Sequence, residues 1–268
     1  MQVESIQGLR EYMEDTSAFL QKHDMTIAMV CDGHGGGEMS KMTSNELPEI
    51  LLNTLHGKRL SNIKTAEIIR NTIVDWGDDH NKVHSGTTLT GVLIRNGVVY
   101  CFNVGDSRTC FKLTPGSFIY MLKPVFASNG DFKNDLVVEC YRPRFFVTRD
   151  HSPDDPDEQT RIYSSGGMIQ DKRLNGILSL TRAIGDSGIG AGLSWVPDIY
   201  WTKVENVDKG DVVMFSDGAY EQERYSKTVD VSSDTLYDMV VSQGVKKTVD
   251  YAYKNGSTDN ITVATLKI

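Results

Sequence analysis

The sequence predicts an α+β fold in which antiparallel sheets are covered by helices. Many short apolar or alternating stretches, typical of strands, are joined by turn sequences. One of these turns, Arg95-Asn96-Gly97, makes residues 86–104 a hairpin of two antiparallel strands. Other stretches have helical periodicity and come in pairs along the chain. Hairpins mixed with paired helices indicate sheets with helices packed outside them.

The same patterns place the elements along the chain. Alternating or β-branched apolar residues predict strands at 16–20, 26–31, 86–94, 98–104, 109–113, 145–148, 177–180, 199–204, 211–215 and 261–268. Helical periodicity predicts helices at 38–55, 65–78, 155–164, 235–243 and 245–254. Residues 114–144 contain aromatic side chains without a clean period. We expect a surface insertion there, either a folded-back hairpin or a recognition segment.

The composition limits the classes of function. Of the 268 residues, 39% are hydrophobic, and no proline- or serine-rich linker divides them, so we expect one domain over residues 1–268. A net charge of −8 and a pI near 5.3 argue against a nucleic-acid partner. The sequence has neither an apolar stretch near the roughly 18 residues of a membrane span nor a basic and apolar leader. We expect a soluble intracellular monomer, cytoplasmic or nuclear, without membrane contact.

The cysteines have no CxxC spacing, and Cys31, Cys101 and Cys110 lie within apolar runs. Buried, reduced thiols are therefore the expected state. Thiol catalysis is the alternative for Cys31, which directly precedes Asp32. A neighbouring carboxylate raises the pKa of a thiol rather than lowering it, which argues against that alternative.

Aspartates stand where apolar runs stop or begin. Asp32, Asp106 and Asp217 follow predicted strands, and Asp259 comes just before one. An acid at a strand end places its charge at the rim of a sheet, so acids from distant segments can converge without a charge crossing the core. Their hard oxygen ligands suit magnesium, manganese or calcium. His34, two residues after Asp32, is then a candidate proton donor beside the metals.

The glycine run at 33–37 offers another interpretation, a nucleotide-binding loop between a strand and a helix. In the G-x-G-x-x-G pattern, however, the third glycine is replaced by Glu38, which places a negative charge where a pyrophosphate must lie. The run at 188–192 fails in a similar way because Leu193 stands at its end. Nucleotide binding therefore receives little weight.

A set of short motifs follows a fixed order along nearly the whole chain. They are Arg10-Glu11-Tyr12-Met13-Glu14-Asp15, Asp32-Gly33-His34-Gly35-Gly36, Ser85-Gly86-Thr87-Thr88, Gly105-Asp106-Ser107-Arg108, Asp150-His151-Ser152-Pro153, Gly166-Gly167, Leu178-Ser179-Leu180-Thr181-Arg182-Ala183-Ile184-Gly185-Asp186, Ser216-Asp217-Gly218 and Ser257-Thr258-Asp259-Asn260. Each is weak alone, but the ordered set resembles the metal-dependent serine/threonine phosphatases of the protein phosphatase 2C (PPM) family. The resemblance implies a four-layer α/β/β/α sandwich of two antiparallel sheets flanked by helices. It also implies hydrolysis of phosphoserine and phosphothreonine in signalling phosphoproteins.

The resemblance implies a two-metal centre. Asp32 would bridge two divalent cations, Mn²⁺ or Mg²⁺. The Gly33 carbonyl would bind one of them, and Asp217 and Asp259 would bind the other. Two cations lower the pKa of a bridging water, and the resulting hydroxide attacks phosphorus directly, without a covalent phosphoenzyme.

The remaining implied roles concern water, phosphate and the leaving group. Glu14 and Asp15 would hold metal-bound waters, and the guanidinium of Arg10 would take a phosphate oxygen. His34 would protonate the leaving serine or threonine oxygen. The ordinary alternatives are an ion pair of Arg10 with Glu11 or Glu14, and a structural His34 that caps the glycine turn.

The family can also hold a weaker third cation, and the resemblance places it at Asp106 and at an acid four residues beyond Asp217. That acid is Glu221 here, where the family commonly has aspartate, and its longer side chain changes the geometry. The alternatives are a turn-capping role for Asp106 and a first-turn helix position for Glu221. Asp186 is interpreted as a turn cap outside the site.

A binding module that keeps the fold without the chemistry is the other class of function. Such proteins lose metal ligands first, and here Asp32, Asp217 and Asp259 are all present, which favours an enzyme. Recognition of the phosphoprotein would then depend on surfaces beside the site, at 185–195 and 114–144.

Overall fold

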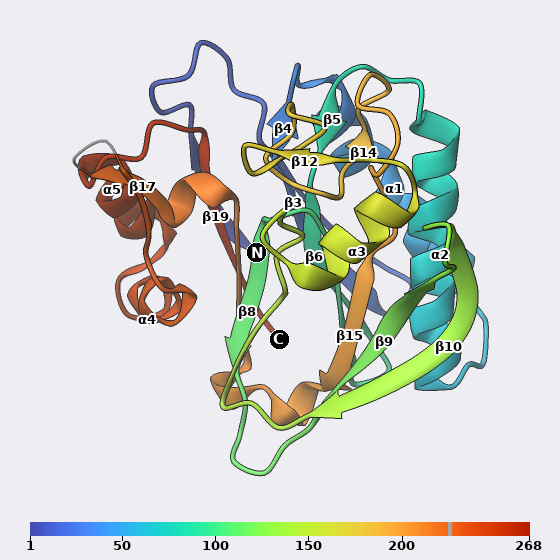
Figure 1. Ribbon diagram of the computed structural model, residues 1–268. Coiled ribbons are helices and arrows are strands. Elements are labelled where there is room, and N and C mark those ends of the chain that lie inside the picture. The colour runs from blue at the N-terminus through green and yellow to red at the C-terminus, as the bar shows by residue number, and fades with distance from the viewer. Residues whose placement is uncertain (225–226) are drawn as a thin grey trace.

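The chain folds into four layers (Figure 1). The computed structural model describes residues 1–224 and 227–268. Two antiparallel sheets lie face to face; α1 (Glu38–Leu55) and α2 (Asn62–His80) cover one of them, and α4 (Ser233–Gln243) and α5 (Val245–Lys254) cover the other. The four-layer sandwich expected from the sequence is confirmed. Within the described ranges, no helix has the length and apolar character needed to cross a membrane.

The strands of the sandwich pair only with antiparallel neighbours. The seven-stranded sheet has the order β10-β9-β15-β7-β6-β3-β2, with β2 (Thr16–Lys22), β3 (Met25–Cys31), β6 (Leu89–Arg95), β7 (Val98–Val104), β9 (Ile119–Phe126), β10 (Phe132–Tyr141) and β15 (Asp198–Lys203). The five-stranded sheet has the order β1-β19-β16-β8-β11, with β1 (Gln2–Ile6), β8 (Arg108–Lys112), β11 (Phe145–Val147), β16 (Asp211–Phe215) and β19 (Ile261–Lys267). Because β3 has antiparallel neighbours on both sides, it does not begin the parallel unit of a nucleotide-binding fold.

The smaller elements lie outside the two main sheets. They are β4 (Gly33–His34), β5 (Gly86–Thr87), β12 (Ile169–Gln170), β13 (Arg173–Leu174), β14 (Ile184–Gly185), β17 (Glu221–Arg224), β18 (Lys227–Asp230), the helix α3 (Pro156–Ser164) and the 3₁₀ turns η1 (Val204–Asn206), η2 (Asp208–Gly210) and η3 (Asp217–Ala219). Strands β14, β5 and β4 form a three-stranded sheet of their own, which carries part of the site described below.

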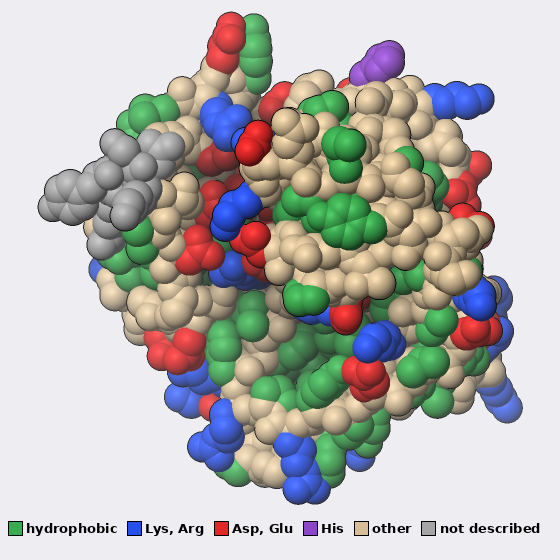
Figure 2. Space-filling model, viewed as in Figure 1, with side chains coloured by type: hydrophobic (Ala, Val, Ile, Leu, Met, Phe, Trp, Pro, Cys, Tyr) green, Lys and Arg blue, Asp and Glu red, His purple; other side chains and the backbone are tan. Residues whose placement is uncertain are grey.

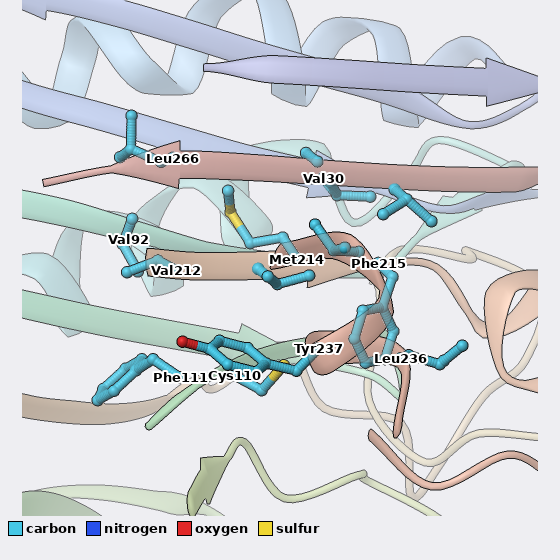
Figure 3. Close-up of a cluster of buried hydrophobic side chains, with 14 of the residues drawn as sticks. Val30, Val92, Cys110, Phe111, Val212, Met214, Phe215, Leu236, Tyr237 and Leu266 are labelled. Atoms are coloured by element: carbon cyan, nitrogen blue, oxygen red, sulfur yellow. The ribbon is translucent and has the colours of Figure 1, made fainter. Parts of the chain in front are cut away.

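The main core fills the space between the two sheets. Figure 3 shows side chains of both sheets directed toward one another, among them the labelled Val30, Val92, Cys110, Val212, Met214 and Leu266, and Leu236 of α4 packs against them. A second core lies between the seven-stranded sheet and α1 and α2, where Met39, Leu47 and Leu51 are fully buried. These buried residues recur at the spacing of one helix face, which is why α1 could be predicted from the sequence.

Turns and caps agree with the local sequence. Asn96 and Gly97 have φ of 50° and 72°, as the two central residues of a tight hairpin turn require, and they connect β6 to β7. Ser61 caps α2 by accepting the Lys64 N–H, and Asp155 caps α3, which begins with a proline. The predicted hairpin at 86–104 is therefore present, although a break at Thr88 divides its first strand into β5 and β6.

Residues 114–144 form the folded-back hairpin β9–β10, which extends the seven-stranded sheet beyond β15. Strand β10 is the outer strand, and the register shifts between Lys133 and Val137. Leu136, Val137 and Val138 are exposed on it by 50%, 42% and 39%. Figure 1 shows this hairpin curving away from the rest of the sheet.

One predicted strand is wrong. Residues 177–180 form a turn region in which only Leu178 makes an isolated bridge, to Leu174. Leu178 and Leu180 alternate with exposed residues because they cover a small separate core around Ile162. Their period of two thus arises from a loop lying on that core rather than from a sheet.

Strands β1, β17 and β18 were not predicted, because β1 is mostly exposed and the other two are short and polar.

Candidate active site

Asp32 stands at the rim of the seven-stranded sheet, directly after β3. Its N–H donates to Thr88 Oγ1 at 3.0 Å, and its carbonyl accepts the Thr88 N–H at 2.9 Å, so its backbone is fixed. Gly33 follows in β4, where an added Cβ would lie 2.5 Å from the Glu14 carbonyl oxygen. A side chain is therefore excluded at Gly33, which offers only its backbone to the site.

Two further predicted metal ligands come from the five-stranded sheet. Asp217 begins η3, two residues beyond the end of β16, and Asp259 lies two residues before β19. Since β16 and β19 are paired neighbours, with Phe215 opposite Val263, both acids reach the same edge of that sheet. Each of the two sheets thus contributes acids at its rim.

These carboxylates converge on Asp32. Loss of solvent, followed by repulsion from Asp15, Asp217 and Asp106, raises the pKa of Asp32 well above its usual value. The pKa of Asp217 is also raised well above its usual value, first by loss of solvent and then by Asp106 and Asp259. Mutual repulsion of this kind requires the carboxylates to lie close together, although they come from distant segments.

The cluster fits divalent cations. Asp15 accepts a hydrogen bond from Ser216 at one oxygen, but its Oδ1 and the Oδ1 of Asp217 are buried without a partner among the described residues. Burial raises the pKa of Asp15 to about 6. Unsatisfied carboxylate oxygens, with no sulfur or nitrogen among them, are ligands for hard cations. Among the described residues, no three acidic, histidine or cysteine side chains form a ready-made ligand group.

Arg10 contacts this cluster directly. Its Nη2 donates to Asp259 Oδ2 at 2.5 Å, and 57% of the Arg10 side chain is exposed. The partner is thus Asp259, and not Glu11 or Glu14 as the alternative from the sequence supposed. Figure 2 shows acidic and basic side chains together in the hollow between the side of the molecule that carries α5 and the side that carries β12. An exposed guanidinium beside such a cluster can reach a phosphate oxygen.

Glu14 joins the N-terminal segment to the glycine turn. Its Oε1 accepts the Gly36 N–H at 2.7 Å, and its own N–H donates to Asn260 Oδ1 at 2.7 Å. The amide of Asn260 in turn donates to two carbonyls in the segment 7–12. Asn260 therefore ties the segment that carries Arg10 to the strand end that carries Asp259. The only signal for this role in the sequence is its place next to that aspartate.

His34 lies in β4 with 27% of its side chain exposed, and its Nε2 is 2.6 Å from Asp186 Oδ2. Glu14 caps the glycine turn, since its Oε1 accepts the Gly36 N–H at 2.7 Å, and Ser85 Oγ accepts the N–H of Met39 in the first turn of α1 at 3.1 Å. The capping role considered for His34 is therefore not observed. The Asp186 carboxylate, interpreted from the sequence as a turn cap, instead holds this histidine. Because 152 positions separate the two residues, the pairing could not be predicted from local sequence.

Asp106 and Glu221, expected at a third cation, are electrostatic neighbours. Loss of solvent and then Asp150 raise the pKa of Asp106 to about 6, and loss of solvent and then Asp106 raise the pKa of Glu221 to about 7. Glu221 begins strand β17 rather than a helix, so the alternative of a first-turn helix acid is wrong. Asp150, which lies in one of the ordered motifs of the sequence, pairs with Arg108 at 2.6 Å beside Asp106.

The cysteines do not contribute to the chemistry. Cys31, Cys101 and Cys110 are buried and free, as expected, and Cys140 is exposed on β10. Burial raises the pKa of the Cys31 thiol to about 12. A thiol with such a pKa is protonated at neutral pH, which argues against thiolate catalysis beside Asp32.

Comparison with known proteins gives consistent relatives. A family model described as "Protein phosphatase 2C" matches residues 1–114 and 125–261. "Protein phosphatase 2C homolog 3" of Schizosaccharomyces pombe is 32% identical over 192 residues, which cover 68% of this chain and 40% of that protein. "Protein phosphatase 2C 1" of Paramecium tetraurelia is 25% identical over 270 residues, which cover 90% of this chain and 80% of that protein. The chain thus spans less than half the length of the yeast relative.

Solved structures agree at the level of the fold. A phosphatase from a pathogenic strain of Toxoplasma gondii has a TM-score of 0.67 at 19% identity, over 98% of this chain and 90% of that chain. A sex determining protein of C. elegans has a TM-score of 0.68 at 21% identity, over 98% of this chain and 63% of that chain. Since the family model accounts for most of the chain on both sides of residues 115–124, the chain belongs to the protein phosphatase 2C family.

Proposed function

We propose that this chain is a metal-dependent phosphatase that hydrolyses phosphoserine and phosphothreonine in proteins. The observation that carries the proposal is the convergence of carboxylates on Asp32, with His34 two residues away and Arg10 exposed beside the cluster. The names of the relatives support the same class of activity.

In this proposal the carboxylate cluster is a two-metal centre for Mn²⁺ or Mg²⁺. Asp32, the Gly33 carbonyl, Asp217 and Asp259 would hold the two ions. Bound cations would lower the pKa of a water molecule to form the nucleophile and would screen the charge of the phosphate. The raised pKa values of Asp32 and Asp217, caused first by burial and then by repulsion, support this role, because the positive charge of a cation would favour the deprotonated carboxylates.

The other residues position water and substrate. Asp15 and Glu14 hold water molecules at the edge of the centre. Arg10 exchanges its contact with Asp259 for one with a phosphate oxygen, and its exposure makes this exchange inexpensive in free energy. His34 then donates a proton to the serine or threonine oxygen as the phosphorus–oxygen bond breaks.

We also propose a weaker third cation between Asp106 and Glu221, whose raised pKa values indicate that each feels the charge of the other acids. Residues 1–268 would act as one catalytic domain and as a monomer on phosphoprotein substrates, with 114–144 as a surface insertion. The family match over residues 1–114 and 125–261 supports a single domain, and its gap at residues 115–124 lies within the proposed insertion.

The test is hydrolysis of a phosphoserine peptide by the full chain after treatment with EDTA, followed by addition of single metals. We expect no turnover in EDTA and recovery with Mn²⁺ or Mg²⁺. Asp32→Asn should stay inactive with every metal. Asp24→Asn is the matched control because Asp24 is exposed on the turn between β2 and β3, and it should keep full activity. Turnover that survives exhaustive chelation would overturn the proposal.

A further inference from the structure

The contact between His34 and Asp186 has the geometry of a fixed pair. The distance from Nε2 to Oδ2 is 2.6 Å, and the exposed fractions are 27% for the histidine and 6% for the aspartate. The carboxylate therefore lies behind the imidazole, on the side away from solvent. A deprotonated carboxylate can only accept, so Nε2 carries the hydrogen and Nδ1 is the nitrogen left for a substrate.

The three-stranded sheet holds this pair in place. His34 in β4 lies opposite Gly86 in β5, and Gly86 lies opposite Gly185 in β14, the residue before Asp186. The two side chains thus meet across the backbone of Gly86. A Cβ at Gly86 would lie 2.1 Å from Asp186 Oδ2 and 2.3 Å from His34 Nε2. The space for the contact exists only because this position is glycine.

The backbone of Asp186 is fixed independently of its side chain. Its φ of 59° lies in the left-handed region, its N–H donates to the Ser85 carbonyl at 3.1 Å, and its carbonyl accepts the Ile189 N–H at 3.0 Å. A left-handed residue other than glycine is uncommon and directs the side chain where an ordinary turn would not. Among the described residues, no lysine or arginine lies within 4.0 Å of its carboxylate, and His34 is its ionic partner.

We propose that Asp186 is a positioning residue for the reaction: it holds the Nε2–H of His34 and thereby turns Nδ1 toward the leaving oxygen of the substrate. This inference rests on the proposed function, in which His34 is the proton donor. In the step itself, the oxygen of a hydroxide, formed when water gives one proton to solvent, forms a bond to phosphorus, and the bond from phosphorus to the serine or threonine oxygen breaks. The proton on Nδ1 moves to that oxygen, while Asp186 keeps its charge and the Nε2–H.

The ordinary alternative is that the pair only stabilises the fold around β14. The two roles differ in what a variant changes. A positioning role affects only the chemical step and only where the leaving group needs a proton, whereas a structural role affects all substrates alike. The positioning role also predicts that the loss of Asp186 has no further effect in a protein that already lacks His34.

The experiment compares Asp186→Gly, His34→Ala and the double variant on a phosphoserine peptide and on p-nitrophenyl phosphate, with Mn²⁺ at saturation. Glycine is chosen because it accepts the left-handed backbone, so the fold should be retained. Asp24→Gly is the matched control, since Asp24 has nearly the same φ, 58°, and is exposed. Thermal unfolding and metal content are measured for every variant.

We expect Asp186→Gly to lower kcat on the phosphopeptide roughly 10- to 100-fold with little change in KM, and to affect p-nitrophenyl phosphate much less. In the His34→Ala background, Asp186→Gly should cause no further loss. If His34→Ala is impaired on the phosphopeptide but Asp186→Gly is not, the inference is wrong and the proposed function stands. Equal losses on both substrates, or additive losses in the double variant, would make Asp186 structural. If His34→Ala itself retains full activity, it is the proposed proton donor that fails.

Discussion

Arg10 and Asp259 form an ion pair across 249 positions of sequence, with Nη2 2.5 Å from Oδ2. The residue expected to bind phosphate is therefore in contact with a residue expected to bind a cation. A cation at Asp259 and a phosphate at Arg10 would each separate the pair and leave the other partner free. The two binding events are thus linked through a contact that exists before either ligand arrives.

This link predicts opposite effects of Arg10→Ala on metal and on substrate. Removing the guanidinium frees Asp259, so the Mn²⁺ concentration for half-maximal activity should fall. Because exposed pairs contribute about 0–1 kcal/mol, the decrease should be at most about fivefold. KM for a phosphopeptide should rise, since a charged contact to phosphate is lost. Metal titrations and substrate titrations of the same preparations measure both effects, and a parallel change in the two constants would contradict the link.

Asp32 and His34 should separate metal binding from proton transfer. Asp32→Ala removes the carboxylate on which the cluster converges, so bound metal and activity should disappear together. His34→Ala should keep both metals but lose about 100-fold or more in rate on alkyl phosphates. The loss should shrink for p-nitrophenyl phosphate, because nitrophenolate leaves without a proton. Elemental analysis and the two rate measurements distinguish the variants, and a metal-free His34→Ala protein would assign that residue to the metal centre.

The metal-free protein should become less stable as the pH rises. The pKa values of Asp15 and Asp106 are raised from 3.8 to about 6, and that of Glu221 from 4.5 to about 7. The folded state then binds more protons than the unfolded chain between about pH 4 and pH 7, so the free energy of unfolding falls across this range. Urea unfolding in EDTA at several pH values measures the slope. Asp106→Asn should flatten it, and excess Mn²⁺ should suppress it, because cations bind the deprotonated carboxylates.

The proposed third cation predicts opposite shifts for its two acids. Glu221 has one methylene more than the family's usual aspartate, so its carboxylate must fold back or act through water, and occupancy should require high metal concentration. Glu221→Asp should lower the metal concentration for half-maximal rate, and Asp106→Asn should raise it without loss of the two-metal core. Identical titration curves for both variants and the unaltered protein would mean that turnover depends on two metals alone.

Much of the fold could be predicted because its main elements have local causes. The predicted bounds of α1 and α5 agree with the structure, since an apolar stripe and a following glycine or polar turn define each helix. The hairpin of β6 and β7 was predictable from its turn. Strand β1 was not, because it lies at an edge of its sheet, where the sequence has little apolar alternation.

The site divides in the same way. The positions of Asp32, Asp217 and Asp259 beside strand ends were predictable because the strands concerned have a clear sequence pattern. The pairing of Arg10 with Asp259 and of His34 with Asp186 was not, because each depends on how distant strand ends meet. Patterns along one strand report which face is buried, but they contain no information about which other segment supplies the partner.

The curved edge strand β10 has a consequence for behaviour at high concentration. A long outer strand with exposed Leu136, Val137 and Val138 is a template on which another chain could add a strand and begin a fibril. The register shift between Lys133 and Val137 interrupts the straight ladder that such growth requires, and Asp135 places a charge within the interruption. The irregularity therefore protects the protein from polymerising through this exposed apolar edge.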